Sequence, residues 1–229
     1  MPAVVPLLPS SVLPDYKHYT PEYNLDDLVR DIKAYLGTSG GISSAEVDNE
    51  YLISLAQKYI SDPNDWARYF YNDTSKNYTR NAIENINLKA NILLLVWNPG
   101  KGSPVHDHAN AHCIMKILAG TLQETVYRIP DQESDRGPLE IKSDKRHTMN
   151  DVTYISDDIG LHRVYNPSSD QVAVSLHREL SIKLRGWNRA DRVLVYTPPN
   201  AADYGYNVYN EATGKACFVP QAKSVPQKE

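Results

Sequence analysis

The sequence has few cysteines, no excess of basic residues and no long hydrophobic run, and each shortage excludes a class of protein. Cys113 and Cys217 are the only cysteines in 229 residues, too few for a disulfide scaffold, so we expect a reducing, cytoplasmic location. The formal charge of −4 gives no reason to expect nucleic acid or a membrane surface as a partner. Chemistry on a small molecule is therefore favoured.

No apolar run approaches the length of a membrane span. The segment Met1–Pro14 is partly apolar, but it lacks a basic start and prolines interrupt it, so it does not resemble a signal peptide. A chain of 229 residues is long enough for one domain with a substantial core and short for two. We predict one domain over residues 1–229, and a monomer.

Hydrophobic spacing predicts helices in the first third of the chain. After a proline-rich, irregular arm at residues 1–19, apolar residues recur at helical intervals within residues 20–73. Asn24 is suited to cap the first helix, which should end before Gly37. We expect three helices, over residues 25–36, from residue 44 or 48 to residue 60, and over residues 62–70.

Short apolar or alternating runs, separated by Gly, Pro, Asn and Asp, follow over residues 74–219, before a tail at residues 220–229. This pattern is typical of an antiparallel β fold. The predicted fold class is mainly β, a jelly-roll barrel whose interior can hold a ligand, preceded by an N-terminal helical cap. The expected strands cover residues 77–83, 91–97, 112–123, 124–129, 139–143, 147–148, 152–155, 162–165 and 172–177.

A pair of histidines, His106 and His108, stands at the turn between two predicted strands. In extended backbone, residues two apart project to the same face, so the two imidazoles would lie side by side while Asp107 points away. Such a pair makes half of a metal site. An isolated pair of this kind is, however, more often part of a surface loop.

The surroundings of the pair favour the metal site. Gly100 stands six residues before His106 and Gly120 seven residues after Cys113, which resembles the first motif of the cupin superfamily. Cys113 stands where that motif usually has a glutamate ligand, and His-Asp-His followed by four residues and Cys resembles eukaryotic cysteine dioxygenases. The resemblance implies a metal held by three neutral histidines. Without a protein carboxylate, the metal keeps its full charge and can attract a thiolate or carboxylate.

The third ligand implied by the resemblance is His162. The segment from Asp158 to Val164 is very close to the same segment of cysteine dioxygenases, although it matches the second cupin motif only in part. His112 should point to the opposite face from Cys113, and we expect it to be structural. His18 and His147 are assigned to the surface.

Tyr78 and Arg80 are candidate substrate-binding residues. They share a strand face, and a guanidinium offers a planar fork suited to a carboxylate, although an arbitrary strand arginine is more often solvated. The tetrapeptide Tyr78–Asn81 resembles the dioxygenase segment whose arginine holds the carboxylate of cysteine. Related enzymes that act on mercaptopropionate usually carry glutamine at this position, so Arg80 favours cysteine as the substrate.

Ser175 and His177 share a strand face, which suits a hydrogen-bond relay. They resemble the Ser-x-His of the dioxygenases, which joins a tyrosine that becomes thioether-linked to the cysteine matching Cys113. In the family the tyrosine follows that histidine by two residues, and here it is Tyr196. Without the resemblance, a core histidine satisfied by a backbone carbonyl explains His177 equally well.

Residues 178–195 separate His177 from Tyr196, where relatives have one leucine. This segment carries a net charge of +3, against −7 for the remainder of the chain. Two interpretations stay open, a translated intron of a fungal-type gene and a true surface loop. Because closing a longer loop adds only about 0.6 kcal/mol per doubling, a loop could still return Tyr196 to the site.

The resemblance extends over most of the chain, from about Tyr19 to Val219. It implies a non-haem iron(II) dioxygenase of cysteine catabolism and taurine biosynthesis, which uses O2 to oxidise the thiol of L-cysteine to cysteine sulfinate. The residues it implies are the metal ligands His106, His108 and His162, the substrate-binding Arg80 and Tyr78, and the catalytic Tyr196, His177, Cys113 and Ser175. Two other classes remain. One is a cupin isomerase or sensor with another divalent metal, and the other is a metal-binding form without turnover because residues 178–195 disturb the site.

Overall fold

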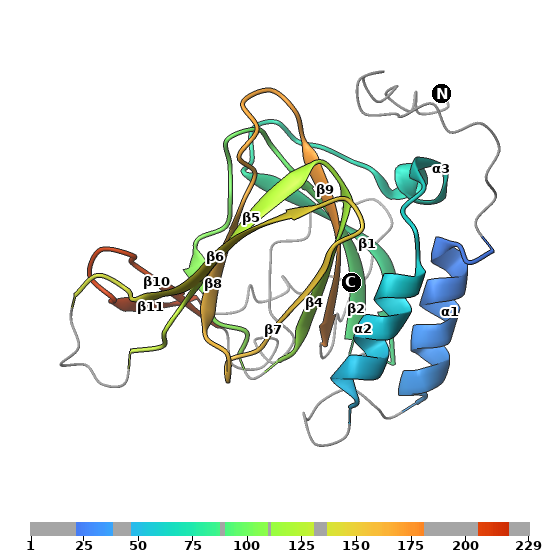
Figure 1. Cartoon of the computed structure of the whole chain (residues 1–229), viewed down its shortest axis with the longest axis horizontal. Helices are drawn as coiled ribbons and strands as arrows, with labels where there is room; N and C mark the ends of the chain where they lie inside the picture. The colour runs from blue at the N-terminus through green and yellow to red at the C-terminus, as the bar shows by residue number, and fades with distance from the viewer. Residues whose placement is uncertain are drawn as a thin grey trace, which may run out of the picture.

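Two antiparallel β-sheets face one another and enclose a barrel, and helices pack against its outside (Figure 1). The computed structural model describes residues 22–38, 47–87, 90–109, 111–130, 137–180 and 206–219, with the backbone alone at 178–180. The helical segments are α1 (Leu25–Leu36), α2 (Asn49–Lys58), α3 (Pro63–Trp66) and the 3-10 turn η1 (Ala67–Tyr69).

The strands form two sheets, with the order β1-β2-β9-β4-β7 in the first and β11-β10-β3-β8-β5-β6 in the second. Their bounds are β1 (Tyr78–Ile86), β2 (Ala90–Trp97), β3 (Val105–His106), β4 (Cys113–Ala119), β5 (Thr121–Tyr127), β6 (Ile141–Thr148), β7 (Val152–Ile155), β8 (Leu161–Tyr165), β9 (Ala173–Leu180), β10 (Tyr206–Tyr209) and β11 (Ala216–Val219). The prediction of a mainly β jelly-roll barrel after an N-terminal helical cap is confirmed.

Local capping sets the ends of the first two helices. The Asn24 side chain accepts a hydrogen bond from the amide of Asp27, whose side chain accepts one from the amide of Asn24. Gly37, with φ of 56°, closes α1, and Asp48 caps α2. The predicted α1 and α2 are confirmed, whereas the third predicted helix is shorter and passes into η1.

Several strand predictions are wrong in detail. The predicted break between residues 123 and 124 lies instead at Gly120, whose φ of 74° makes the turn between β4 and β5. The predicted strands 139–143 and 147–148 are one strand, β6, whose exposed polar residues hide its period. The strands β3, β10 and β11 are not anticipated.

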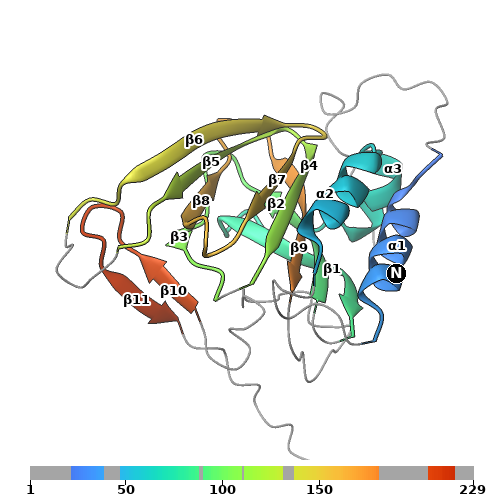
Figure 2. The ribbon, with the colours of Figure 1, turned by 60° about the horizontal axis from the view of Figure 1, so that its bottom comes forward.

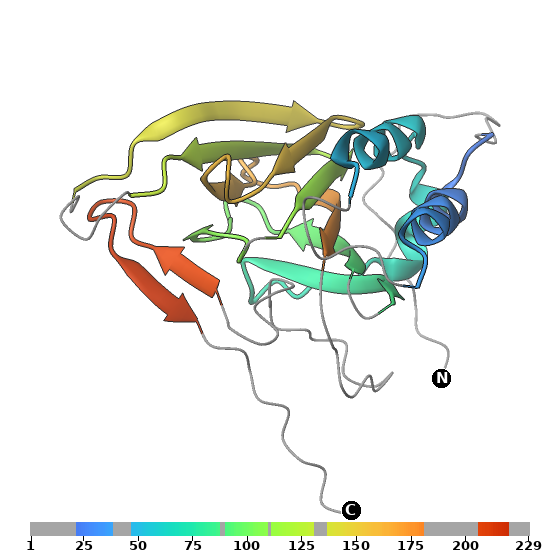
Figure 3. The same cartoon turned by 90° about the horizontal axis from the view of Figure 1, so that it is seen from below.

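The inner strands β2 and β4 of the first sheet are buried on both faces, which explains their long apolar runs. In β2, Ile92, Leu94 and Val96 pack in the cluster that includes the helices, while Leu93 and Leu95 pack in a second cluster inside the barrel. The helices lie at one end of the molecule and the β10–β11 hairpin at the other (Figures 2 and 3). Among the described helices, none has the length and apolar character needed to cross a bilayer.

Candidate metal centre

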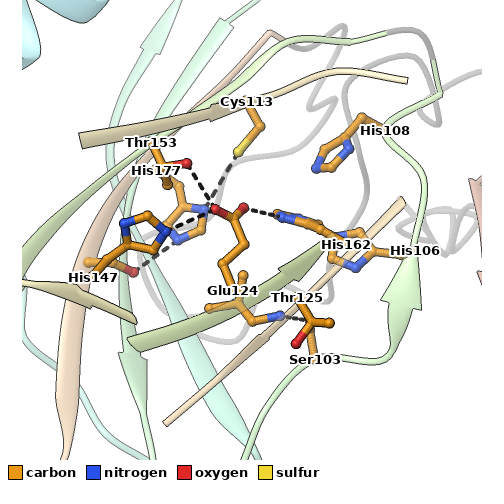
Figure 4. A network of polar contacts seen from close by, with 12 residues as sticks. Ser103, His106, His108, Cys113, Glu124, Thr125, His147, Thr153, His162 and His177 are labelled. Carbon is orange, nitrogen blue, oxygen red and sulfur yellow. Dashed lines mark hydrogen bonds and ion pairs between the residues drawn. The ribbon is translucent and has the colours of Figure 1, made fainter. Parts of the chain in front are cut away.

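Three buried histidine side chains converge inside the barrel (Figure 4). His106 lies in β3, opposite His162 of β8, and His108 follows β3 by two residues. Each imidazole offers a nitrogen within 4.8 Å of those offered by the other two. Imidazole nitrogens grouped in this way can bind one divalent transition metal ion.

The predicted alternation of side chains around His106 and His108 is held by β10. Asp107 accepts hydrogen bonds from the amide of Asn207 at 3.1 Å and from its side chain at 2.8 Å. The Asp107 amide in turn donates to the Asn207 carbonyl. Because Asp107 is fastened to the neighbouring strand, the histidines on either side of it face the interior together.

The electrostatic environment keeps the histidines in the state that binds metal. Burial, reinforced by the nearby His162, holds the pKa values of His106 and His108 well below their usual value, so both imidazoles are neutral. His106 Nδ1 lies 3.0 Å from the Pro104 carbonyl oxygen, which can only accept, so Nδ1 donates and Nε2 remains as the ligand atom. The His108 amide donates to Asp157 at 2.7 Å.

His162 is held by a carboxylate, Glu124 of β5. His162 Nδ1 donates to Glu124 Oε1 at 2.7 Å, which again leaves Nε2 as the ligand atom. Burial alone would raise the pKa of the Glu124 carboxyl, but the adjacent His147 and the hydrogen bond from His162 outweigh it and bring the pKa well below its usual range. The assignment of His147 to the surface is corrected, because its side chain is only 14% exposed and its Nε2 lies 3.3 Å from Glu124.

A glycine allows β8 to approach β5 just before His162. Gly160 has φ of 149°, and a Cβ at this position would lie 2.2 Å from the Tyr127 carbonyl oxygen. Only glycine accommodates both the backbone conformation and this contact. The glycine of the motif therefore has a direct part in placing the third histidine.

A small cavity adjoins the histidine cluster. The three histidines line it together with Tyr78, Arg80, Cys113 and His177, among others. Arg80 is 9% exposed, and its guanidinium carbon lies 5.5 Å from the centre of the Tyr78 ring. The cavity thus combines a metal site with a buried cation.

A hydrogen-bond chain runs along one side of this cavity. Trp97 Nε1 donates to Ser175 Oγ at 2.8 Å, and Ser175 Oγ lies 2.9 Å from His177 Nε2. Since the indole can only donate, the serine hydroxyl is free to donate to His177, whose Nδ1 then faces Cys113 Sγ at 3.8 Å. Burial, followed by the charge of Arg80, holds the pKa of His177 well below its usual value.

Comparison with known proteins places these features in a family. The family model described as cysteine dioxygenase type I matches residues 36–181. The chain belongs to this family. It is 43% identical over 132 residues to cysteine dioxygenase type 1 of Homo sapiens, across 58% of this chain and 64% of that protein. With the Danio rerio protein of the same name it shares 37% over 153 residues, across 67% of this chain and 72% of that protein.

The chain therefore spans less than two thirds of the length of the human cysteine dioxygenase type 1 that it matches. Among solved structures, an oxalate oxidase is 15% identical with a TM-score of 0.38, over 48% of this chain and 54% of that one. A cupin superfamily protein from Desulfitobacterium hafniense is 14% identical with a TM-score of 0.36, over 50% and 84%.

This chain departs from the cysteine dioxygenase pattern at the position that pairs with Cys113. In the family a tyrosine stands two residues after the histidine that matches His177, and that position here is 179. In the structure, the backbone of residue 179 pairs directly with Cys113 of β4. Glu179 occupies this position in the sequence, while Tyr196 lies outside the described residues, as do residues 181–195. Residues 178–180 continue β9.

Two residues of the site are not anticipated from the sequence. Trp97 ends an apolar strand, so the sequence suggests only a core residue, although its indole nitrogen donates to Ser175. Glu124 lies 38 positions from His162, so no local spacing connects them. An acidic residue at an inward position of a predicted strand was the available signal for Glu124, because a buried carboxylate needs partners.

Proposed function

We propose that this protein is a cysteine dioxygenase, which converts the thiol of L-cysteine and one O2 into cysteine sulfinate. The observation that carries the proposal is the convergence of three histidine nitrogens beside the buried Arg80, with no carboxylate joining the group among the described residues. Both oxygen atoms of O2 enter the product, and the single thiol proton passes to solvent when the sulfinate forms.

The donor set fits a divalent metal, and the family favours iron(II). Imidazole ligands suit Zn, Cu, Fe and Ni alike, so the choice of iron rests on membership of the cysteine dioxygenase family. Iron(II) held by His106, His108 and His162 would supply positions for the thiolate and O2 and a path for electrons from the sulfur to O2. The chain's own residues then bind and orient the substrate.

Arg80 and Tyr78 are proposed to bind the substrate. A planar guanidinium can take both oxygens of a carboxylate, and its burial strengthens that interaction. The Tyr78 ring lies 4.6 Å from Trp97 between ring centres, which fixes one side of the cavity. A substrate carboxylate on Arg80 would leave the short cysteine side chain directed into the same cavity that the three histidines line.

Cys113, Ser175 and His177, which line or adjoin the same cavity, are proposed to act on the reacting atoms. The hydrogen-bond chain from Trp97 through Ser175 fixes the ring of His177 and directs its Nδ1 proton inward. There it can hold a proton or a hydrogen bond to a reacting sulfur or oxygen. A thioether between Cys113 and Tyr196 would add a phenol beside this imidazole, and it belongs to the proposal.

Oxygen uptake by the purified chain tests the proposal. After anaerobic loading with iron(II), L-cysteine should start O2 consumption, and 18O2 should place two labelled atoms in the sulfinate. His162→Gln should abolish both, whereas His112→Gln should retain them, because His112 contacts Tyr154 and Asn49 outside the cavity. An iron-loaded, folded protein that consumes no O2 with cysteine would contradict the proposal.

A second function, metal binding with little turnover, is favoured by one observation. The position that pairs with Cys113 holds Glu179, and Tyr196 lies seventeen residues further along the chain. If residues 178–194 keep Tyr196 from this position, the cross-link fails while the three histidines remain. The monomeric state and the cytoplasmic location also stay predictions, the first of which light scattering in solution would test.

A further inference from the structure

Glu124 stands inside the barrel between two hollows. On one side it contacts His162, which lines the small cavity beside the histidine cluster. On the other side it lines a second hollow together with His147, Thr153 and the exposed Lys142 and Lys145. Figure 4 shows the carboxylate between His162 and the pair formed by His147 and Thr153.

The register of the second sheet makes this arrangement. In β5, Glu124 pairs with Lys145 of β6 and Val164 of β8. His147 lies two positions after Lys145, and His162 lies two positions before Val164. Both histidines therefore share the inner face with Glu124 as its diagonal neighbours. Thr153 reaches the same carboxylate from β7 in the opposite sheet, so three strands converge on it.

Each carboxylate oxygen has its own partners. Oε1 accepts the hydrogen bond from His162 Nδ1 at 2.7 Å, while Oε2 accepts one from Thr153 Oγ1 at 2.8 Å and lies 3.3 Å from His147 Nε2. The partners of Oε2 fix the plane of the carboxylate, and the carboxylate then fixes the ring of His162. Glu124 is 4% exposed, so water does not compete strongly for these contacts.

We propose that Glu124 is a positioning residue for the metal ligand His162, and that His147 and Thr153 orient its carboxylate. The inference rests on the proposed metal site. A carboxylate that accepts from Nδ1 selects the tautomer with a bare Nε2 and makes that nitrogen a stronger donor to a metal. It also places one negative charge next to a ligand set that is otherwise neutral.

The first test needs no metal. Side-chain 15N NMR of the histidines in the metal-free protein should show His162 protonated at Nδ1. In Glu124→Ala that resonance should move to a mixture of tautomers, and in Glu124→Gln, whose amide oxygen can still accept, it should move less. An unchanged Nδ1–H tautomer in a folded Glu124→Ala would overturn the proposal.

The second test titrates Co²⁺ into each variant and follows its visible absorption. Affinity should fall roughly 10- to 100-fold in Glu124→Ala and less in Glu124→Gln and His147→Leu. The matched controls are Asp144→Asn, an exposed carboxylate on β6, and Lys145→Gln, on the same strand as His147. Both should bind Co²⁺ as the unmodified chain does.

The outcomes separate the two proposals. If the unmodified chain binds no Co²⁺, the proposed metal site fails, while the tautomer measurement still decides the role of Glu124. If the unmodified chain binds Co²⁺ and Glu124→Ala binds it within twofold, the positioning role fails alone. Should Glu124→Ala not fold, the isosteric Glu124→Gln decides through its Co²⁺ affinity, because it removes the negative charge, and an affinity equal to that of the unmodified chain would overturn the proposal.

Discussion

Arg80 places a buried guanidinium beside the histidine cluster, where the carboxylate of a small substrate can reach it. Glutamine is short and uncharged, so it can offer one hydrogen bond but no charge. We expect Arg80→Gln to raise KM for L-cysteine about 10- to 100-fold, corresponding to a charged hydrogen bond of about 1.5–3 kcal/mol. The value of kcat should change less, since the thiol and the metal ligands are untouched. Steady-state O2 uptake measures both.

Cysteamine provides the control substrate, because it has the thiol and amine of cysteine without the carboxylate. Its kinetics should be nearly the same in Arg80→Gln and the unmodified chain. Arg163→Gln is the control variant, since Arg163 pairs with Glu211 outside the cavity. An equal loss with cysteine and cysteamine would show that Arg80 supports the fold and does not bind the substrate.

Residues joined by local spacing could be predicted from the sequence, and those joined across strands could not. The period of two along a strand places His106 and His108 together, and the resemblance supplies His162. Nothing near Glu124 in the sequence points to His162, because the register between β5 and β8 decides that contact. From the sequence His147 is assigned to the surface for the same reason, since most residues of its strand are exposed.

The helices and strands that could be predicted are those with clear capping residues or a continuous apolar run. Asn24 and Gly37 bracket α1, and the two-sided burial of β2 gives a continuous apolar run. In contrast, β10 and β11 are half-buried or exposed and follow a long segment outside the described residues. Their place in the second sheet depends on the pairing of β10 with β3. Strand β3 is only two residues long, too short to show an alternation of apolar and polar residues in the sequence.

A buried lysine lies where the helical cap meets the barrel. Lys116 of β4 is 1% exposed, and its ammonium donates to the Asn150 carbonyl at 3.2 Å. The Asn150 side chain accepts from the Ser61 amide at 2.8 Å, which ties the segment after α2 to the β6–β7 turn. Burial lowers the pKa of Lys116 to about 8, although the charge of Asp151 opposes this.

This lysine should make the stability depend on pH in a definite direction. Below pH 8 the ammonium is charged in both states, so the folded state bears the full cost of burying it. Between pH 8 and the ordinary lysine pKa of 10.5 the unfolded state binds more protons, so the free energy of unfolding rises with pH. Lys116→Met should therefore be more stable at pH 7, by about 1–3 kcal/mol, and the difference should shrink toward pH 10.5.

Urea unfolding at pH 7, 9 and 10.5 measures this difference. The exposed Lys101 serves as the control, and Lys101→Met should leave the free energy of unfolding unchanged across the range. A Lys116→Met protein that is less stable at pH 7, with a difference independent of pH, would mean that the hydrogen bond to Asn150 outweighs the cost of burying the charge.

At the scale of the whole molecule, the segment after His177 decides whether the site can be completed. Deleting residues 178–194 joins His177 to Val195 and moves Tyr196 to the position that now pairs with Cys113. Strand β9 would continue through Val195 and Tyr196, because valine and tyrosine both favour strands. We expect the shortened chain to form the Cys113–Tyr196 thioether with loss of two hydrogens to O2, and to turn over cysteine faster than the full chain.

Peptide mass spectrometry after iron and cysteine treatment detects the cross-link, and O2 uptake gives the rates. The shortened chain with Tyr196→Phe is the control, because it has the same backbone without the phenol and should form no linked peptide. If the full chain forms the thioether to the same extent as the shortened one, residues 178–195 are a true loop that returns Tyr196 to the site at small entropic cost. If only the shortened chain forms it, the segment blocks the site, and sequencing of the native transcript across it then distinguishes an unspliced intron from a loop that impairs the enzyme.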